Sequence, residues 1–307
     1  MPYCQLLVYC VVTDFYLSLN SRDLYQMSNM RNFFLTLDLE EWYHLEYFQN
    51  QNPEKTPIMV KNLSPFFNLL DKYNIKITVF VLGELIDSNI ELIKDISNRG
   101  HDIGIHGWDH RLLQNKTTSG FINEILRTKE YLESIIDKTV IGYRAPCFSL
   151  NNEKLEALKR VGIKYDSSYI KFKEHPLYGD LSMDGLKKIN DLVYEKEDFY
   201  EFELPTIKVF SKNIPISGGG YFRLIPKFIF SILWRQYLKT NSNFVMYIHP
   251  FELTEAKVHL RGFRLLDKIR FSIGRKNNLK KLEWFLKKCL NEDFKFVTIS
   301  NFLHKND

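Results

Sequence analysis

Short apolar runs alternate with longer amphipathic segments along most of this chain, and this alternation is the feature that most limits its fold. Runs with the length and composition of strands occur at 32–39, 75–82, 102–105, 140–143, 164–167, 202–204, 244–248 and 294–299. Apolar residues recur at helical spacing in 60–73, 85–98, 119–136, 152–161, 226–239 and 278–290. Strands separated by helices form parallel sheets that are buried on both faces. Because no linker rich in Pro, Gly or Ser divides the chain, we predict a single-domain α/β fold, a distorted (β/α) barrel with parallel strands.

The first 29 residues stand apart from this pattern. The stretch QLLVYCVV is apolar, but it is too short to cross a membrane and lacks the basic region of a secretory signal. Met30 directly precedes the first predicted strand. We therefore expect residues 1–29 to be a dispensable extension and residues 30–307 to form the barrel with a basic C-terminal segment. A weak membrane-targeting role for residues 1–29 is the alternative.

Charge and cysteine content narrow the class of protein. The net charge of +5 is too small for its 307 residues to indicate a nucleic-acid partner. The four cysteines form no CxxC pair, so reduced thiols are the simplest interpretation. We expect a cytoplasmic protein, with a periplasmic or membrane-peripheral location as the alternatives, and we expect no transmembrane span.

Polar side chains follow the ends of four predicted strands. The residues concerned are Asp38, Glu40 and Glu41 after the first strand, His106 and His110 after 102–105, Arg144 after 140–143 and His249 after 244–248. In a (β/α) barrel the active site lies at the carboxyl ends of the strands. The sequence therefore predicts one site built from these separate strand ends.

His106 and His110 are spaced so that both imidazoles of a helical turn can bind one ion. Two hydrogen-bonded surface histidines are the alternative interpretation. Two histidines and one carboxylate leave open positions on a metal, which is typical of a catalytic site rather than a structural one.

The carboxylate of that set is predicted to be Glu40 rather than Glu41. Side chains alternate along a strand, so Leu35, Leu37 and Leu39 share one face. Three leucines suit the face packed under helices, which leaves Asp38 and Glu40 in the barrel interior. Glu41 falls on the leucine side and is expected to be a cap or a loop charge.

Arg144 and His249 have both catalytic and structural interpretations. The guanidinium of Arg144 suits a bond to a carboxylate, either to orient Asp38 or as a structural ion pair. His249 precedes Pro250 at a strand end, where it can protonate a leaving group or serve as a buried core histidine.

Two further segments are candidates for ligand binding. ISGGGYFR, residues 216–223, lacks the spacing of a phosphate-binding loop and is interpreted as a tight loop near a ligand or as a plain turn. The segment 257–288 is rich in Lys and Arg, and either holds an anionic ligand or forms a solvated helix face.

Four segments resemble, in sequence and in order, the motifs of the polysaccharide deacetylase (NodB-homology) family, carbohydrate esterase family 4. They are TLDLEEW, HGWDH, YRAPCFS and YIHP. The resemblance covers residues from about 32 to 300. DLEEWYH, YDSSYI, SGGGYFRLIP and the tail beginning GFRLLDKIRF are similar to the subfamily encoded with bacterial exopolysaccharide and exosortase systems. The family implies a distorted (β/α) barrel, a divalent metal that is usually zinc, and hydrolysis of N-acetyl groups on a sugar polymer.

The resemblance also implies roles for individual residues. It makes Asp38 the catalytic base, Arg144 the residue that holds the base, His249 the general acid, the Cys147 N–H an oxyanion donor, and His106 and His110 metal ligands. Substrate contacts are assigned to Trp108, Gly219, Gly220, Tyr221 and Arg223. The commonest family motif has two adjacent aspartates, whereas here Leu39 separates Asp38 from Glu40.

The expected function is a metal-dependent hydrolase that removes N-acetyl groups from sugar residues of a bacterial exopolysaccharide or its precursor. The expected partner is an N-acetylated polysaccharide or oligosaccharide, lipid-linked forms included. Two alternatives remain open: a related barrel amidohydrolase acting on a small non-sugar amide, and a non-catalytic carbohydrate-binding relative.

Overall fold

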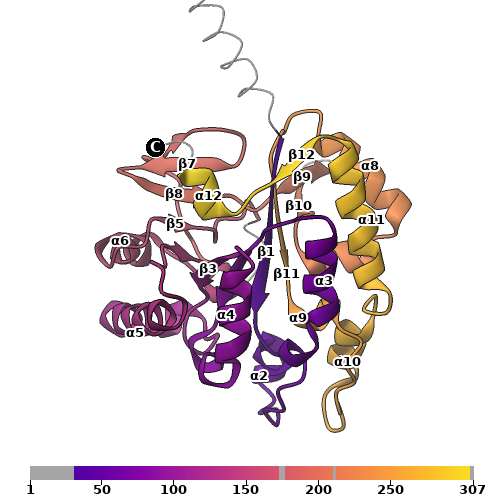
Figure 1. The fold of residues 1–307 in the computed structure, drawn as a ribbon, viewed down its shortest axis with the longest axis horizontal. Helices are drawn as coiled ribbons and strands as arrows, with labels where there is room; N and C mark the ends of the chain where they lie inside the picture. The colour runs from indigo at the N-terminus through magenta and orange to yellow at the C-terminus, as the bar shows by residue number, and fades with distance from the viewer. Residues whose placement is uncertain (1–30, 173–176, 210–211, 305–307) are drawn as a thin grey trace, which may run out of the picture.

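A computed structural model describes residues 31–172, 177–209 and 212–304, so the predicted N-terminal extension lies outside the described residues. The fold is α/β, with a curled sheet of mainly parallel strands (Figure 1). The strands are β1 (Arg31–Leu39), β2 (Thr78–Val81), β3 (Asp102–Ile105), β4 (Gly142–Tyr143), β5 (Tyr165–Asp166), β6 (Lys187–Lys188), β7 (Val193–Lys196), β8 (Phe199–Phe202), β9 (Thr206–Val209), β10 (Lys212–Pro215), β11 (Phe244–Ile248) and β12 (Phe294–Phe296).

The main sheet has the strand order β11-β1-β2-β3-β4-β5-β8-β7-β6, with β12 also paired to β1. Strands β1 to β5, β8, β11 and β12 pair in parallel. Beyond β8, single backbone contacts continue the curl: Ile216 donates to Pro205, and Tyr247 of β11 donates to Ser217. These contacts bring the two ends of the curled sheet together without a regular strand pair, as expected of a distorted barrel.

The helices lie around the outside of this sheet and at its two ends (Figure 1). They are α2 (Glu46–Gln49), α3 (Ser64–Lys72), α4 (Ile90–Asn98), α5 (Thr118–Ile136), α6 (Asn152–Arg160), α7 (Gly219–Leu224), α8 (Lys227–Tyr237), α9 (Pro250–Leu253), α10 (Leu265–Ser272), α11 (Asn278–Asn291) and α12 (Ile299–Leu303). Two of them begin at side-chain caps, where Thr117 accepts from the Gly120 N–H and Asn151 from the Lys154 N–H. In Figure 1, α2, α9 and α10 lie together below the carboxyl ends of β1 and β11.

The two faces of β1 differ as its alternation predicts. Leu35, Leu37 and Leu39 belong to the large core that includes buried residues of the surrounding helices. Phe34 belongs to a second core inside the curl, where it meets Phe202 edge to face. Ile299 and Leu303 of the short helix α12 belong to this inner core. The Asp38 side of β1 therefore faces the barrel interior.

Antiparallel strands interrupt the predicted parallel pattern. β6, β7 and β8 form an antiparallel meander at one edge, and β9 and β10 form a hairpin. The β7–β8 turn contains Glu197 and Asp198, both with positive φ, which is the backbone of a type I′ hairpin turn. Neither residue is glycine, so the sequence carries no strong signal for this turn. Among the described residues, no helix is both long and apolar enough to span a bilayer.

His101, just before β3, gives the fold a testable dependence on pH. Its Nδ1 accepts a hydrogen bond from the Ile77 N–H at 3.2 Å, and its buried Nε2 has no partner among the described residues. Burial lowers the pKa of His101 to about 4. Between pH 6.5 and 4, His101 is therefore protonated in the unfolded chain but neutral in the folded chain. Stability is therefore expected to fall as pH falls through this window, by at most roughly 3 kcal/mol from this residue.

His101→Asn keeps an acceptor near the Nδ1 position and removes the titration. Urea unfolding at pH 7, 5 and 4 is expected to show a smaller loss of stability with acid in this variant than in the parent. Equal losses in the two proteins would mean that His101 does not cause the acid sensitivity.

Candidate active site

The predicted polar residues converge at the carboxyl ends of the strands. Asp38 lies in β1 with Glu40 just beyond it, His106 follows β3, Arg144 follows β4 and His249 follows β11. Apart from His249, whose side chain is 18% exposed, these side chains are almost fully buried. Buried charged groups are costly unless they are paired or bound to an ion, so this cluster requires a specific arrangement of partners.

Arg144 holds Asp38 in a fixed position. Its Nη1 lies 2.8 Å from Asp38 Oδ1 and also donates to Thr36 Oγ1 at 2.5 Å. Its Nε and Nη2 donate to the carbonyl and hydroxyl of Ser167 at 2.9 and 2.8 Å. The guanidinium stacks over the ring of Phe80. This arrangement fixes Oδ1 and leaves Oδ2 of Asp38 facing the site.

Glu40, His106 and His110 offer three donor atoms that lie within 4.8 Å of one another. Glu40 Oε2 lies 2.9 Å from His110 Nε2, yet within the part of the chain that the structure describes neither Glu40 Oε2 nor His110 Nδ1 makes a hydrogen bond. His106 Nδ1 lies 2.9 Å from the Arg144 carbonyl, which leaves Nε2 free to act as a ligand. Buried donor atoms that converge without satisfying one another fit a divalent cation, and the mixed imidazole–carboxylate set suits a transition-metal ion.

The electrostatics of the cluster favour ligand-competent protonation states. Burial would raise the pKa of Glu40, but the neighbouring His110, His249 and His106 outweigh burial and lower it to about 2. Burial lowers the pKa of His106 to about 4. Metal ligands must be an ionised carboxylate and neutral imidazoles. Glu40 and His106 therefore have the forms that a cation requires.

Glu41 has a different role in the structure. Its two carboxylate oxygens accept hydrogen bonds from the Met59 and Val60 N–H groups, each at 3.0 Å. Glu41 therefore caps the turn before α3, which agrees with the prediction of a capping charge. Glu40 rather than Glu41 lies beside His106 and His110.

His249 lies on the other side of the carboxylates. Its Nε2 is 3.8 Å from Asp38 Oδ2 and 3.7 Å from Glu40 Oε1, and its Nδ1 is 3.1 Å from Glu252 Oε2. Burial would lower the pKa of His249, but the carboxylates of Glu40, Glu252 and Asp38 outweigh burial and raise it to about 9. At neutral pH the ring therefore carries a proton that Nε2 can donate into the site.

Sequence analysis missed two groups that support this geometry. Glu252, at the start of α9, accepts from the His249 N–H and contacts its ring, so it fixes the orientation of the imidazole. The sequence HPFE could have predicted this contact. Pro250 is typical of the first position of a helix, and Glu252 follows His249 by three residues, which is the spacing of a contact across the first turn. His44 is the second; its Nδ1 accepts from the Glu41 N–H and its Nε2 lies 2.5 Å from Glu84, behind His110.

Cys147 sits in a short 3₁₀ turn, Pro146–Phe148, three residues after Arg144. Its φ of 49° is left-handed, which turns the backbone sharply at the site's edge. N–H groups of the first turn of a helix have no partner within the helix, so the Cys147 N–H is available to an anion. Burial raises the pKa of the Cys147 thiol, so the sulfur is a poor nucleophile.

The segment 216–223 is not the predicted tight loop, because residues Gly219–Leu224 form helix α7. A Cβ at Gly219 would overlap the carboxylate of Glu252, so glycine is required for α7 to pack against the base of the site. Arg223 is buried and donates to the carbonyls of Arg270, Phe271 and Ile273. Its guanidinium is thus occupied by the protein and braces α10. Tyr221 stays partly exposed, and a Cβ added at Gly220 would meet Glu252 Oε1 at 3.8 Å, an ordinary van der Waals contact.

Trp108 lies at the edge of a cavity of about 700 Å³ that also includes His44 and Glu84. The Arg127 guanidinium stacks on its ring at 3.7 Å. The ring is therefore held rigidly at the wall of a space large enough for a sugar residue.

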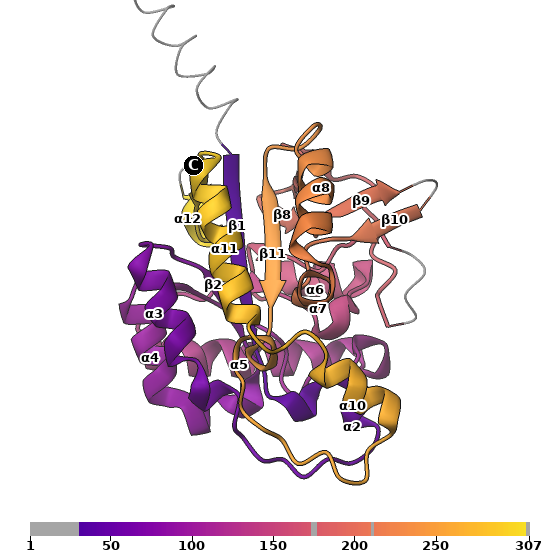
Figure 2. The same ribbon diagram turned by 90° about the vertical axis from the view of Figure 1, so that its right-hand side faces the viewer.

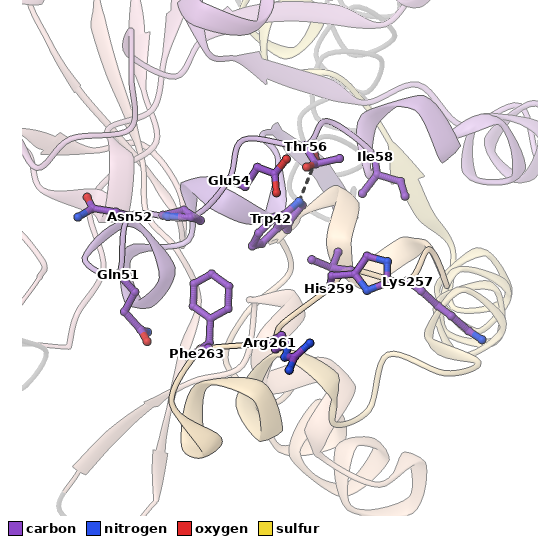
Figure 3. A pocket seen from close by; sticks show the side chains of 13 residues that line it. Trp42, Gln51, Asn52, Glu54, Thr56, Ile58, Lys257, His259, Arg261 and Phe263 are labelled. Atoms are coloured by element: carbon purple, nitrogen blue, oxygen red, sulfur yellow. Dashed lines mark hydrogen bonds between the residues drawn. The ribbon is translucent and has the colours of Figure 1, made fainter.

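A second cavity of about 450 Å³ lies between the loop 51–58 and the segment 257–263 (Figure 3). Trp42, two residues after Glu40, forms its inner wall and donates to the Thr56 carbonyl. Lys257, His259 and Arg261 line the opposite side. This is the part of the predicted basic segment that faces an open cavity, whereas Arg275 donates to the carbonyls of Phe251, Thr254 and Ala256.

This geometry can be compared with known proteins. Residues 54–165 match the polysaccharide deacetylase family. Residues 167–304 match a domain of unknown function, DUF3473. The polysaccharide deacetylase match includes His106, His110 and Arg144, whereas β1 with Asp38 and Glu40 precedes it. The DUF3473 region supplies β11, His249 and Glu252, so the two matched regions contribute to one cluster.

Curated relatives are similar over part of their length. The chain is 29% identical over 168 residues to a peptidoglycan deacetylase of Helicobacter pylori, covering 49% of this chain and 57% of that protein. It is 34% identical over 94 residues to the peptidoglycan-N-acetylglucosamine deacetylase PgdA of Listeria monocytogenes, covering 29% and 19%. The chain thus spans about half of the first relative and a fifth of the second.

Solved structures share the fold. A Mycobacterium smegmatis protein that is named as a polysaccharide deacetylase superposes with a TM-score of 0.57 at 18% identity, covering 90% of each chain. A family 4 carbohydrate esterase pseudoenzyme from Bacillus anthracis superposes with a TM-score of 0.50 at 13% identity, covering 90% of this chain and 66% of that one. At these identities the likeness shows the fold, and activity has to be argued from the site.

Proposed function

We propose that this chain is a metal-dependent hydrolase that removes N-acetyl groups from sugar residues of a bacterial exopolysaccharide or of its precursor. The observation that carries the proposal is the position of Asp38 and His249 beside the donor set of Glu40, His106 and His110. A base, an acid and an incomplete ligand set within one buried cluster are the parts that amide hydrolysis needs. The similarity to deacetylases named for peptidoglycan supports an N-acetylated sugar as the substrate class.

In the proposed reaction, water adds to the acetyl carbonyl carbon, the C–N bond breaks, and acetate and a free amine leave. A zinc ion held by Glu40, His106 and His110 would supply Lewis acidity to the carbonyl and lower the pKa of water. Asp38 Oδ2 accepts the proton of the attacking water while Arg144 holds the other oxygen at 2.8 Å. The Cys147 N–H donates toward the developing oxyanion, an interaction typically worth about 3 kcal/mol.

His249 completes the reaction by protonating the departing nitrogen. An amide nitrogen leaves as an amine only if it gains a proton, and the raised pKa of His249 keeps that proton in place. Glu252 contacts the opposite ring nitrogen at 3.1 Å and thereby directs the Nε2 proton into the site.

The direct test is acetate release from N-acetylglucosamine oligomers, measured before and after treatment with a chelator and after zinc is restored. We expect release that the chelator abolishes and zinc recovers. Acetate release that continues unchanged after the chelator has removed all metal from the protein would contradict the metal-dependent mechanism.

A small non-sugar amide is the first alternative substrate. The cavities beside Trp42 and Trp108 favour an extended ligand over a small one, because each has an aromatic wall that lies two residues along the chain from Glu40 or His106. Hydrolysis of small acetamides with no hydrolysis of oligomers would favour the alternative.

A non-catalytic carbohydrate-binding role is the second alternative, since one similar structure belongs to a protein described as a pseudoenzyme. Binding of the oligomers without acetate release, in metal-loaded protein, would favour that role.

Glu252→Gln tests the proposed positioning of His249. Removing this negative charge is expected to lower the pKa of His249 and reduce acetate release by about 10- to 100-fold. Because a general acid must be protonated, activity falls as pH rises through its pKa, so the alkaline limb of the pH–rate profile is expected to move to lower pH. A lower rate with an unmoved limb would indicate a purely structural role for Glu252.

A further inference from the structure

Two helical segments outside the cluster expose large apolar side chains to solvent. Eight of the eleven exposed large hydrophobic residues among those described lie in these segments. They are Leu224, Phe228, Ile229 and Ile232 at the end of α7 and in α8, and Leu265, Leu266, Ile269 and Ile273 in and just after α10. Single exposed apolar residues are normal on a protein surface, but a concentration of this kind indicates an interaction site.

The α10 helix is amphipathic with its larger apolar stripe facing outward. Its inner side buries Phe271, which packs against Phe48 and stacks on Phe251, and Asp267, which pairs with Arg264. On the outer side, Leu265 is 70% exposed and Leu266 is 78% exposed. The apolar outer side of α10 is therefore exposed to solvent, although such a side is normally buried in a globular core.

The two segments meet at their ends. The Arg223 guanidinium donates to the carbonyls of Arg270, Phe271 and Ile273. The backbone at Gly274 runs so close to that of Arg223 that an added Cβ would lie 2.7 Å from the Arg223 carbonyl oxygen. Leu224 and Ile273, each about half exposed, thus follow two contacting stretches of backbone. Figure 2 shows α8, α7 and α10 in succession along the side facing the viewer. We call the eight exposed residues together the α8–α10 face.

Positive charge surrounds this face. Asp267 is the one acidic residue in the ranges 221–240 and 261–281, and eight Lys and Arg side chains in these ranges are exposed: Lys227, Arg235, Lys239, Arg261, Arg264, Arg270, Lys276 and Lys280. Arg223, Arg275 and Lys281 in the same ranges donate to backbone carbonyls instead. The one acid is buried and paired, so it does not offset the exposed bases. A second copy of the chain would bring the same positive charges against one another across a two-fold interface, which disfavours self-association.

We propose that the α8–α10 face docks onto a membrane surface that contains anionic lipids. Exposed Leu, Ile and Phe enter the boundary between headgroups and acyl chains, while the surrounding Lys and Arg contact lipid phosphates. Phe271, on the inner side of α10, stacks on Phe251, and Phe251 stacks on His249, so docking would place the cluster next to the bilayer. The proposal does not depend on the proposed reaction, and it favours a membrane-peripheral location.

Vesicle binding of the full chain tests the proposal. Sedimentation is measured with vesicles of phosphatidylcholine alone and of phosphatidylcholine mixed with phosphatidylglycerol, at low and high salt. We expect binding to the mixed vesicles that weakens with salt. In the triple variant Leu265→Gln, Leu266→Gln and Ile269→Gln, which leaves the charge unchanged, the partition coefficient is expected to fall by about 100-fold or more.

Ile189→Gln is the matched control, because Ile189 is 47% exposed in the turn between β6 and β7, outside the α8–α10 face. It is expected to bind vesicles like the parent. Thermal unfolding of each variant shows whether the fold is retained, which is expected because the substituted side chains are exposed. No binding by the parent overturns the proposal, as does a folded triple variant that binds equally well. A parent that dimerises, with a monomeric triple variant and no vesicle binding, assigns the face to a second copy and also overturns it.

Discussion

Asp38→Asn is expected to reduce acetate release by about 10²- to 10⁴-fold while the protein retains its metal. An amide cannot accept the proton of the attacking water, whereas the ligand set of Glu40, His106 and His110 is unchanged. The variant is also expected to be less stable, because the buried Arg144 guanidinium loses its carboxylate partner at 2.8 Å. Metal content, acetate release and thermal midpoint are therefore measured on the same preparation.

Thr36→Val separates loss of the base from loosening of Arg144. Thr36 accepts from the same Nη1 that binds Asp38, so the variant weakens the hold on Arg144 and keeps the base. We expect less than about a tenfold loss of activity, since Ser167 and Asp38 still hold the guanidinium. If Thr36→Val were as inactive as Asp38→Asn, positioning by Arg144 rather than proton transfer would explain both.

Glu40→Gln and Glu41→Gln are expected to have opposite effects on metal content and stability. Glu40→Gln replaces a charged ligand by a neutral amide, and we expect metal affinity to fall by at least about 100-fold. Glu41→Gln leaves the donor set intact but weakens the bonds to the Met59 and Val60 N–H groups. We expect it to retain metal and to lose about 1–3 kcal/mol of unfolding free energy.

The measurement is metal per chain after dialysis, together with denaturant unfolding of both variants. The adjacent positions and the identical chemical change make each variant the control for the other. Loss of metal in Glu41→Gln with retention in Glu40→Gln would show that Glu41 is the ligand and that the described geometry does not represent the metal-bound state.

Local periodicity in the sequence predicted the parallel strands of the curled sheet, whereas the antiparallel strands β6, β7, β9 and β10 were not predicted. The strands β3 and β11 were predicted with their observed bounds, and the alternation in FFLTLDL correctly separated the leucine face from the Asp38 face. A strand's two faces follow from a period of two residues, which needs no knowledge of distant partners. In the same way, polar residues after buried strands predicted which side chains the fold would bring together.

Only the tertiary structure decided which partners those side chains have. Arg223, expected to bind substrate, has its guanidinium occupied by carbonyls 47 to 50 residues away. Glu252 supports His249 because Pro250 starts a helix there, and Gly219 allows α7 to approach its carboxylate. The leucines of α10 would be assigned to a core by composition, yet they face solvent because Phe271 and Asp267 occupy the inner side. Hydrogen-bond partners and exposure depend on which distant segments meet, and local patterns of residues do not contain that information.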